Sequence, residues 1–333
     1  MKKITALLLA LLMLVGALAG CGKQNDTNKT DKLSIVTTIF PEYDWVREIL
    51  GDKADNAEVT MLLDNGVDLH SYQPTADDIV KISDCDLFLY VGGESDGWVD
   101  DALKNATNKN MKVINLLDVL GDSVKTEEVV EGMQETEHDH DHDHSKEVST
   151  FEDEEEKDEH VWLSLKNAEV FVNAISKSLQ ELDPDNRDTY AANAAAYIEK
   201  LSALDGEYQA AVDAATYKTV VFGDRFPFRY LVDDYGLRYY AAFVGCSAET
   251  EASFETVSFL AKKVDELKLP CVLTIEGAQH KIAETIVRNT AEKNQKVLTM
   301  DSLQSTSSKD VANGTTYLSV MEKNLSVLKE ALG

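Results

Sequence analysis

Short apolar runs rich in β-branched residues alternate with helical patterns along most of the chain, and this alternation limits the possible folds more than any other feature of the sequence. Each run has the length of a buried strand and is bounded by turn residues or by apolar residues at helical spacing. The predicted strands are residues 33–40, 57–63, 86–91 and 111–116 in the first half of the chain, and 219–223, 239–244 and 270–275 in the second. Strands that alternate with helices form βαβ units with parallel strands. The sequence therefore predicts an α/β fold with mostly parallel sheets flanked by helices.

Two long helical patterns separate the two groups of strands. They cover residues 168–182 and 186–215, and Asp183-Pro184-Asp185 breaks the helix between them. We therefore expect two α/β lobes joined by a long helix. The predicted boundaries are 33–182 for the first lobe, 183–216 for the linking helix and 217–333 for the second lobe. In such folds ligands bind at the carboxyl ends of the strands, so a ligand site is expected in the cleft between the lobes.

The first residues are predicted to be a targeting segment. Two lysines precede an apolar run at residues 4–18, which is the pattern of a secretory signal peptide and is too short for a stable membrane span. The run ends in Leu-Ala-Gly-Cys21, which resembles a bacterial lipobox, so residues 1–20 are expected to be removed and Cys21 to carry lipid. Residues 21–32 then form the lipidated start and a flexible tether. The protein is thus expected outside the cytoplasm, anchored to the cell membrane through Cys21; the alternative is a soluble secreted protein.

The strong negative charge narrows the possible partners. The chain has 60 acidic residues against 32 Lys and Arg, a formal net charge of −28, and such a field repels phosphate backbones. We therefore expect no nucleic-acid partner. Four cysteines are too few for a disulfide scaffold, and no Cys-x-x-Cys pair is present. Apart from Cys21 there remain Cys85, Cys246 and Cys271, so at most one pair of these three can form, and the sequence does not say which.

Residues 134–159 interrupt the alternation of strands and helices. This segment is dense in acidic residues and nearly free of apolar ones, so we predict a disordered loop inside the first lobe. It contains the run His-Asp-His-Asp-His-Asp-His. Imidazoles and carboxylates in a flexible segment can bind a borderline cation such as Zn²⁺. The predicted auxiliary metal-gathering residues are His138, His140, His142 and His144.

Two further histidines stand in loops at the edges of predicted elements. His70 follows the strand at 57–63 and precedes a helix whose predicted N-cap is Thr75, which places it at the carboxyl end of a strand. His160 lies in Asp-Glu-His-Val-Trp-Leu, residues 158–163, before the first long helix. A single histidine is more often structural than a ligand. Two at lobe edges, beside a metal-gathering segment, favour metal binding.

Together these motifs resemble a known family. His-x-Tyr-x-Pro-Thr at 70–75, Asp-x-His-Val-Trp-Leu at 158–163, the histidine-rich insert between them and the lipobox are similar to the zinc and manganese substrate-binding lipoproteins of ABC importers, the cluster A-I or ZnuA-like family. The resemblance covers essentially the whole mature chain. It implies two α/β lobes bridged by a rigid long helix, and a monomer that captures a divalent metal ion and delivers it to a membrane permease. It also implies that His70 and His160 are metal ligands.

The third ligand position departs from the family pattern. Members usually have a histidine after the first strand of the second lobe, whereas this chain has Gly223-Asp224-Arg225 there. Asp224 is the nearest candidate ligand, and Glu276, after the strand at 270–275, is a second, because manganese-type members resemble this chain in carrying carboxylates in these regions. Asp224 can instead form a salt bridge with a nearby arginine, and Glu276 can be a helix cap or a solvated acid. Two imidazoles and two carboxylates suit Zn²⁺ or Mn²⁺, and the histidine-rich segment favours zinc.

Two other functions compete with metal transport. Histidines and carboxylates also build the sites of zinc hydrolases, but the chain has no His-Glu-x-x-His motif and no Gly-x-Ser-x-Gly motif. A surface adhesin is the other alternative, in which the cleft ligands would be incidental. We expect a metal-binding transport protein rather than an enzyme, with zinc as its ion and manganese as the alternative.

Overall fold

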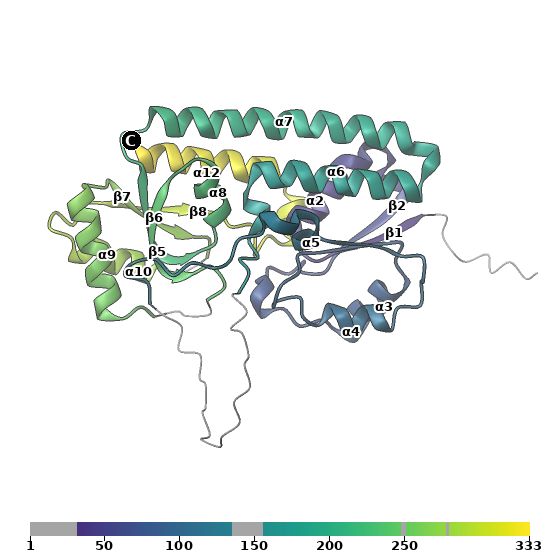
Figure 1. Ribbon diagram of the computed structural model, residues 1–333, viewed down its shortest axis with the longest axis horizontal. Coiled ribbons are helices and arrows are strands. Elements are labelled where there is room, and N and C mark those ends of the chain that lie inside the picture. Colours follow the sequence, from purple (N-terminus) through teal and green to yellow (C-terminus); the bar gives the residue numbers. More distant parts are fainter. Residues whose placement is uncertain (1–31, 135–155, 248–250, 278–279) are drawn as a thin grey trace, which may run out of the picture. The chain divides into compact units, whose positions relative to one another are not determined.

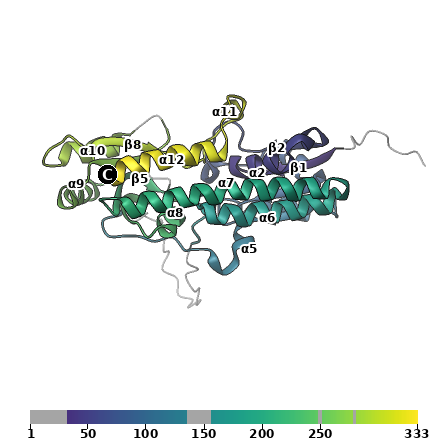
Figure 2. The same ribbon diagram turned by 90° about the horizontal axis from the view of Figure 1, so that it is seen from above.

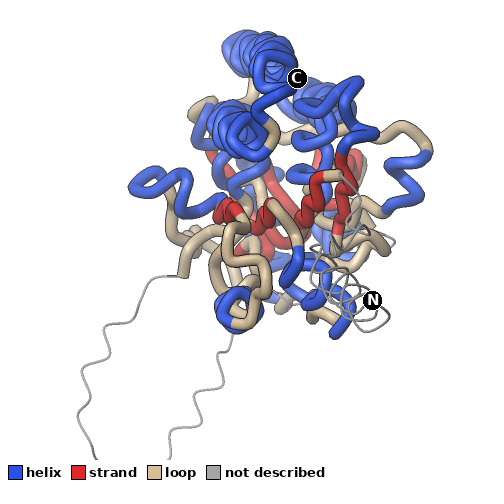
Figure 3. The backbone as a smooth tube through the Cα atoms, turned by 90° about the vertical axis from the view of Figure 1, so that its right-hand side faces the viewer, coloured by secondary structure: helices blue, strands red, loops and turns tan. Residues whose placement is uncertain are grey.

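The computed structural model describes residues 32–134, 156–247, 251–277 and 280–333 of the chain. Within it, Leu33–Gly333 form one compact unit built on two separate four-stranded sheets (Figure 1). Neighbouring strands are parallel throughout both sheets. Helices lie on both sides of the strands (Figure 3). The predicted α/β class, with parallel sheets flanked by helices and a long helix between them, is confirmed.

The first sheet, with strand order β2-β1-β3-β4, forms the first lobe. Its elements are β1 (Leu33–Thr37), α2 (Phe40–Leu50), β2 (Ala57–Met61), α3 (Ala76–Asp84), β3 (Leu87–Tyr90), α4 (Val99–Lys104), β4 (Lys112–Asn115) and α5 (Leu116–Leu120). Every residue of β3 is buried, as expected of a central strand in a parallel sheet covered on both faces. Thr75 caps α3 as predicted, because its side chain accepts a hydrogen bond from the backbone N–H of Asp78.

The second sheet, with strand order β6-β5-β7-β8, forms the second lobe. Its elements are β5 (Thr219–Phe226), α8 (Arg229–Asp234), β6 (Arg238–Val244), α9 (Phe254–Leu267), β7 (Cys271–Ile275), α10 (Lys281–Asn289), β8 (Lys296–Met300), α11 (Ser308–Ala312) and α12 (Tyr317–Leu332). The pairing of β5 with β6 changes register between Phe222 and Arg225, which marks a bulge. Asp224 lies in this bulge.

Two long helices follow the first sheet in the chain. They are α6 (Leu165–Leu182) and α7 (Arg187–Ala214), and α12 packs against α7 (Figure 2). One stripe of α7 is buried at helical spacing, through Tyr190, Ala194, Tyr197, Leu201, Leu204, Tyr208 and Val212. This continuous apolar stripe lets one helix serve both lobes, because it packs against α2 of the first lobe and α12 of the second.

Buried aromatic side chains tie the two lobes together beneath α7. Trp45 of α2 lies against Tyr317 of α12, with ring centroids 5.2 Å apart. The hydroxyl of Tyr317 donates to the backbone oxygen of Trp162 at 2.7 Å, and Trp162 Nε1 donates to the backbone oxygen of Ser302 at 2.9 Å. Since Trp162 directly follows the segment that holds His160, the same core fixes that segment between the lobes.

The end of the acidic segment differs from the prediction. Residues 135–155, with His138, His140, His142 and His144, lie outside the described residues, but Asp158 and Glu159 are buried rather than part of a disordered loop. Backbone hydrogen bonds join this end to the chain after α5, from Glu127 N to Glu156 O at 2.8 Å and from Asp158 N to Lys125 O at 2.8 Å. Acidic composition predicts disorder only where the carboxylates lack partners, and here both buried carboxylates have them.

Candidate metal centre

His70 stands in a short 3₁₀ turn, Leu69–Ser71, between β2 and α3. Asp68 begins this turn, and its side chain accepts a hydrogen bond from the backbone N–H of His70 at 3.0 Å. The ring nitrogen Nδ1 of His70 lies 2.8 Å from Ser95 Oγ and 3.5 Å from a carboxylate oxygen of Glu159. The turn thus holds the ring in one orientation and leaves Nε2 directed away from these partners.

His160 is fully buried, immediately before the 3₁₀ turn Val161–Leu163. One carboxylate oxygen of Asp158 lies 2.9 Å from the backbone N–H and 2.9 Å from Nδ1 of His160. A hydrogen bond from Nδ1–H to a carboxylate places the free electron pair of the ring on Nε2, the form that binds a metal ion. The ring also packs against the indole of Trp162, with centroids 5.3 Å apart.

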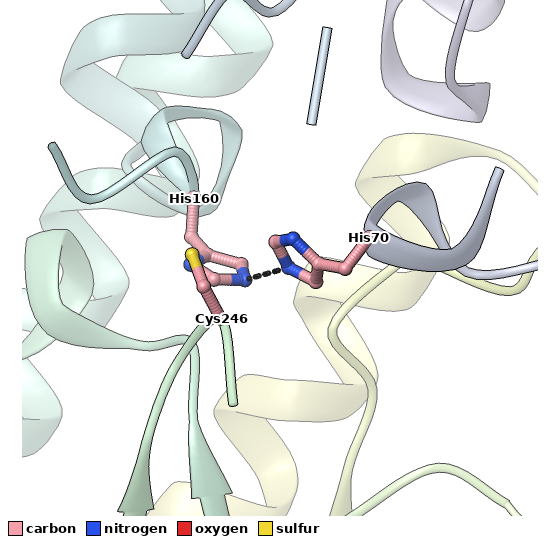
Figure 4. Close-up of side chains that lie close together, drawn as sticks. All are labelled: His70, His160 and Cys246. Atoms are coloured by element: carbon pink, nitrogen blue, oxygen red, sulfur yellow. Dashed lines mark hydrogen bonds between the residues drawn. The ribbon is translucent and has the colours of Figure 1, made fainter. Parts of the chain in front are cut away.

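The Nε2 atoms of the two rings point toward each other (Figure 4). Nε2 of His70 and Nε2 of His160 are 3.2 Å apart. Two nitrogens bound to one tetrahedral zinc ion at about 2.0–2.1 Å are separated by about 3.3 Å, so the observed spacing fits a shared ion. Burial and the neighbouring ring of His160 lower the pKa of His70 to about 3, so His70 is neutral and able to act as a ligand near pH 7.

A third donor meets the two histidines, and sequence reasoning missed it. The sulfur of Cys246 and a ring nitrogen of each histidine all lie within 4.8 Å of one another (Figure 4). Cys246 follows β6 and its neighbour Gly245, so it comes from the carboxyl end of a second-lobe strand. The sequence signal for Cys246 was its place just after the strand predicted at 239–244, separated from it by Gly245.

The two predicted carboxylate ligands lie elsewhere in the second lobe. Asp224 Oδ2 accepts hydrogen bonds from the hydroxyl of Thr274 at 2.6 Å and from the backbone N–H of Ile275 at 3.4 Å. Glu276 accepts from the backbone N–H and the hydroxyl of Ser302, each at 2.7 Å. In the part of the chain that the structure describes, neither carboxylate belongs to the group of donor atoms within 4.8 Å around His70 and His160. Among the described residues, Asp224 also forms no salt bridge with Arg225 or Arg229, whose partners are Asp68, Glu128 and Asp233.

The arginine beside Asp224 forms a contact across the cleft. The guanidinium of Arg225 pairs with the carboxylate of Asp68, which begins the turn of His70. Gln304 adds a second link to the same carboxylate: in the orientation that satisfies its amide, the nitrogen lies 3.0 Å from Asp68 Oδ2. The second lobe therefore holds the turn of His70 in place.

A cavity of about 270 Å³ opens beside His70. It is lined by His70, Glu94, Ser95, Glu156, Lys157, Glu159 and Cys246. Three glutamates against one lysine give this cavity a negative field, which favours the entry of a cation. Burial raises the pKa of Glu159, which lies against the ring of His70.

Comparison with known proteins places the chain in a family. A family profile described as "Zinc-uptake complex component A periplasmic", ZnuA, matches residues 35–331. The chain is 35% identical over 330 residues to the zinc-binding lipoprotein AdcA of Streptococcus pneumoniae TIGR4, covering 99% of this chain but 61% of AdcA. It is 32% identical to the high-affinity zinc uptake system protein ZnuA of Bacillus subtilis, covering 94% of this chain and 93% of that protein. The chain thus spans about three fifths of the length of the AdcA relatives it matches.

Solved structures agree with this placement. The Zn(II)-bound ZnuA-like domain of Streptococcus pneumoniae AdcA matches with a TM-score of 0.68 and 32% identity, over 90% of this chain and 99% of that domain. The metal-dependent lipoprotein YcdH of Bacillus subtilis matches with a TM-score of 0.70 and 28% identity, over 90% and 99% of the two chains. Among the described residues no helix is both long and apolar enough to cross a membrane. The predicted resemblance is confirmed: the chain belongs to the ZnuA family.

Proposed function

We propose that the protein captures Zn²⁺ outside the cytoplasm and delivers it to an ABC-type permease in the cell membrane. The observation that carries this proposal is the pair of Nε2 atoms of His70 and His160, 3.2 Å apart at the boundary between the lobes. Both rings are oriented through Nδ1, so both present the nitrogen that a metal ion binds. The named functions of AdcA and ZnuA support the choice of zinc.

Binding and release require no chemical reaction, so the proposed role is not enzymatic. Zinc is the cargo of the protein. Neutral imidazoles that already face each other lose little conformational entropy on binding, which favours a tight site. The negative field of the neighbouring cavity would raise the local concentration of the cation before it reaches the two rings.

Anchoring and the histidine-rich segment complete the proposal. Lipid attached to Cys21, including palmitate, would hold the protein on the outer face of the membrane, close to the permease. Two relatives in the AdcA group carry the word lipoprotein in their names, which supports this anchoring. His138, His140, His142 and His144 would gather zinc at lower affinity and add to its supply at the cleft.

The direct test is zinc binding by the purified protein in competition with a chromophoric chelator. The wild type should bind one zinc ion tightly, and His70→Ala and His160→Ala should each weaken that site at least about 100-fold, because each removes a ligand. His280→Ala is the matched control, since this half-buried histidine lies 3.2 Å from Thr274 Oγ1 and outside the pair. Wild-type affinity in both ligand variants would refute the assignment.

Manganese binding and adhesion are the alternatives to be measured alongside. A competitive titration of Zn²⁺ against Mn²⁺ decides the preferred ion. A structure described as the laminin-binding adhesin Lmb of Streptococcus agalactiae matches with a TM-score of 0.70 and 26% identity, so binding to immobilised laminin is the adhesion assay. Tight laminin binding that persists in His70→Ala would favour adhesion over transport.

A further inference from the structure

Cys246 comes from the second lobe, as the family pattern led us to expect of another ligand, but it follows β6 rather than lying in β5. It follows β6 at the edge where the parallel strands of the second lobe end. In Figure 4 the sulfur lies beside the ring of His160, and it is within 4.8 Å of a ring nitrogen of each histidine. In a tetrahedral zinc site with Zn–S of about 2.3 Å and Zn–N of about 2.05 Å, sulfur and nitrogen are about 3.6 Å apart. A small closure of the group around an ion would reach this spacing.

The backbone at Gly245 explains how the sulfur comes so close. A Cβ atom at Gly245 would lie 2.7 Å from Cε1 and 2.9 Å from Nδ1 of His160. Only a residue without a side chain lets the strand end pass directly against this ring. The next side chain, that of Cys246, is thereby placed beside the same ring. Gly245 allows the close approach of the backbone to the ring of His160, and Cys246 supplies the sulfur next to it.

A second set of contacts fixes the position of Cys246. Its backbone N–H donates to Glu127 Oε1 at 2.9 Å, and the backbone N–H of Glu127 donates to Glu156 O at 2.8 Å. The chain continues from Glu156 directly to Asp158 and His160. The cysteine and the histidine are therefore held by the same stretch of paired backbone.

The other two described cysteines have surroundings that packing explains. All three are unpaired thiols. Cys85 is fully buried and lies 3.2 Å from the backbone oxygen of Ile82, and Cys271 is buried within β7. Cys246 is half-buried and lines the cavity together with His70. Of the thiols that the structure describes, it alone faces a space that a metal ion can enter.

We propose that Cys246 is the third protein ligand of the cleft site, bound to zinc as a thiolate beside His70 and His160. This inference rests on the proposed zinc-binding function and refines it. As the S–Zn bond forms, the thiol proton is released to the solvent, and the cavity side of the ion remains open to water. A sulfur ligand with two imidazoles favours Zn²⁺ over Mn²⁺, because manganese prefers oxygen donors. Cys246 is therefore the residue that sets the selectivity of the site.

Cobalt is the probe for this ligand set, because Co²⁺ takes the geometry of zinc and thiolate binding gives it a strong charge-transfer absorption in the near ultraviolet. The purified protein loaded with one equivalent of Co²⁺ should show this band. Cys246→Ser should lose it, whereas Cys85→Ala and Cys271→Ala should retain it. Zinc affinity in Cys246→Ser should fall by about 100-fold or more, and the ratio of zinc to manganese affinity should fall with it.

The outcomes separate this inference from the function on which it rests. A wild-type protein that binds one cobalt without the thiolate band, or a folded Cys246→Ser that keeps zinc affinity within about threefold, overturns the role of Cys246 while zinc capture stands. A wild type that binds neither ion overturns both. Cys246→His is a second test in case the serine variant does not fold. With its imidazole as the third ligand it should bind zinc tightly, and with cobalt it should show no thiolate band.

Discussion

Replacing Asp158 tests how the structure prepares His160 for a metal ion. The carboxylate accepts from the backbone N–H and from Nδ1 of His160 at the same distance, 2.9 Å. The backbone bond is present with and without metal, so its contribution cancels in the binding equilibrium. The contribution of the hydrogen bond from Nδ1–H to Asp158 does not cancel, because a cation bound at Nε2 makes Nδ1–H a stronger donor. A charge-assisted hydrogen bond is about twice as strong as a neutral one, a difference of about 1–1.5 kcal/mol.

Asp158→Asn keeps an acceptor oxygen but removes the charge, so zinc affinity should fall about tenfold, which equals about 1.4 kcal/mol. Asp158→Ala also frees the ring to rotate and should cost about 100-fold. Competition with a chromophoric chelator measures both. Asp183→Asn is the control, because Asp183 also accepts two side-chain hydrogen bonds, from Asn186 and Tyr190, at the end of α6. If Asp158→Ala binds zinc within twofold of wild type, the orienting role of this carboxylate is wrong.

Four further outcomes follow from the structure. Gly245→Ala should lower zinc affinity about tenfold or more in the chelator assay, because the methyl group must push the ring of His160 away from 2.7 Å. Gly206→Ala, on the exposed face of α7 with nothing within 4 Å of the added atom, should raise the free energy of unfolding by about 0.5–1 kcal/mol in urea melts and leave zinc affinity unchanged. Burial, with the charge of Asp96, raises the pKa of the Glu42 carboxyl from 4.5 to about 8. The contribution of Glu42 to the free energy of unfolding is therefore complete below pH 4.5 and is lost as the pH rises through 8. Glu42→Gln should gain stability relative to wild type between pH 5 and 9 in urea melts. Deleting residues 137–154 should remove weak zinc equivalents in calorimetry and leave one tight site, since the ordered residues that lead to His160 remain.

The fold could be predicted because its signals are local. The run Leu87–Tyr90 is buried throughout, so it stands out in the sequence as a continuous apolar stretch. The stripe of α7 is visible at helical spacing. The strand β8, Lys296–Met300, was missed because its residues are largely half-exposed or exposed, and it lies at the edge of its sheet. An edge strand lacks the continuous apolar signal of a central one.

The site was only partly predictable because its residues meet through tertiary contacts. His70 and His160 could be singled out, since each stands in a loop beside a predicted element. The buried state of Asp158 and Glu159 could not, because composition describes a segment as a whole and not the partners of its last residues. From the sequence, Cys246 is only one of three cysteines among which at most one disulfide pair can form. Its place after the strand predicted at 239–244 marks it as a candidate, but only the fold shows that it lies beside two histidines far away in the chain.

The bulge in β5 holds the residues where the family pattern predicts a third ligand. The family pattern points to the end of this strand, where the chain has Asp224 and Arg225. The structure turns Asp224 toward Thr274 inside the second lobe, and Arg225 pairs with Asp68 across the cleft. Burial and the ring of His160 lower the pKa of His70 most, and the positive charge of Arg225 lowers it further. A guanidinium cannot bind a cation, so Arg225 supplies a contact between the lobes. The second-lobe donor that we propose comes from a neighbouring strand, because Cys246 at the end of β6 lies beside both histidines.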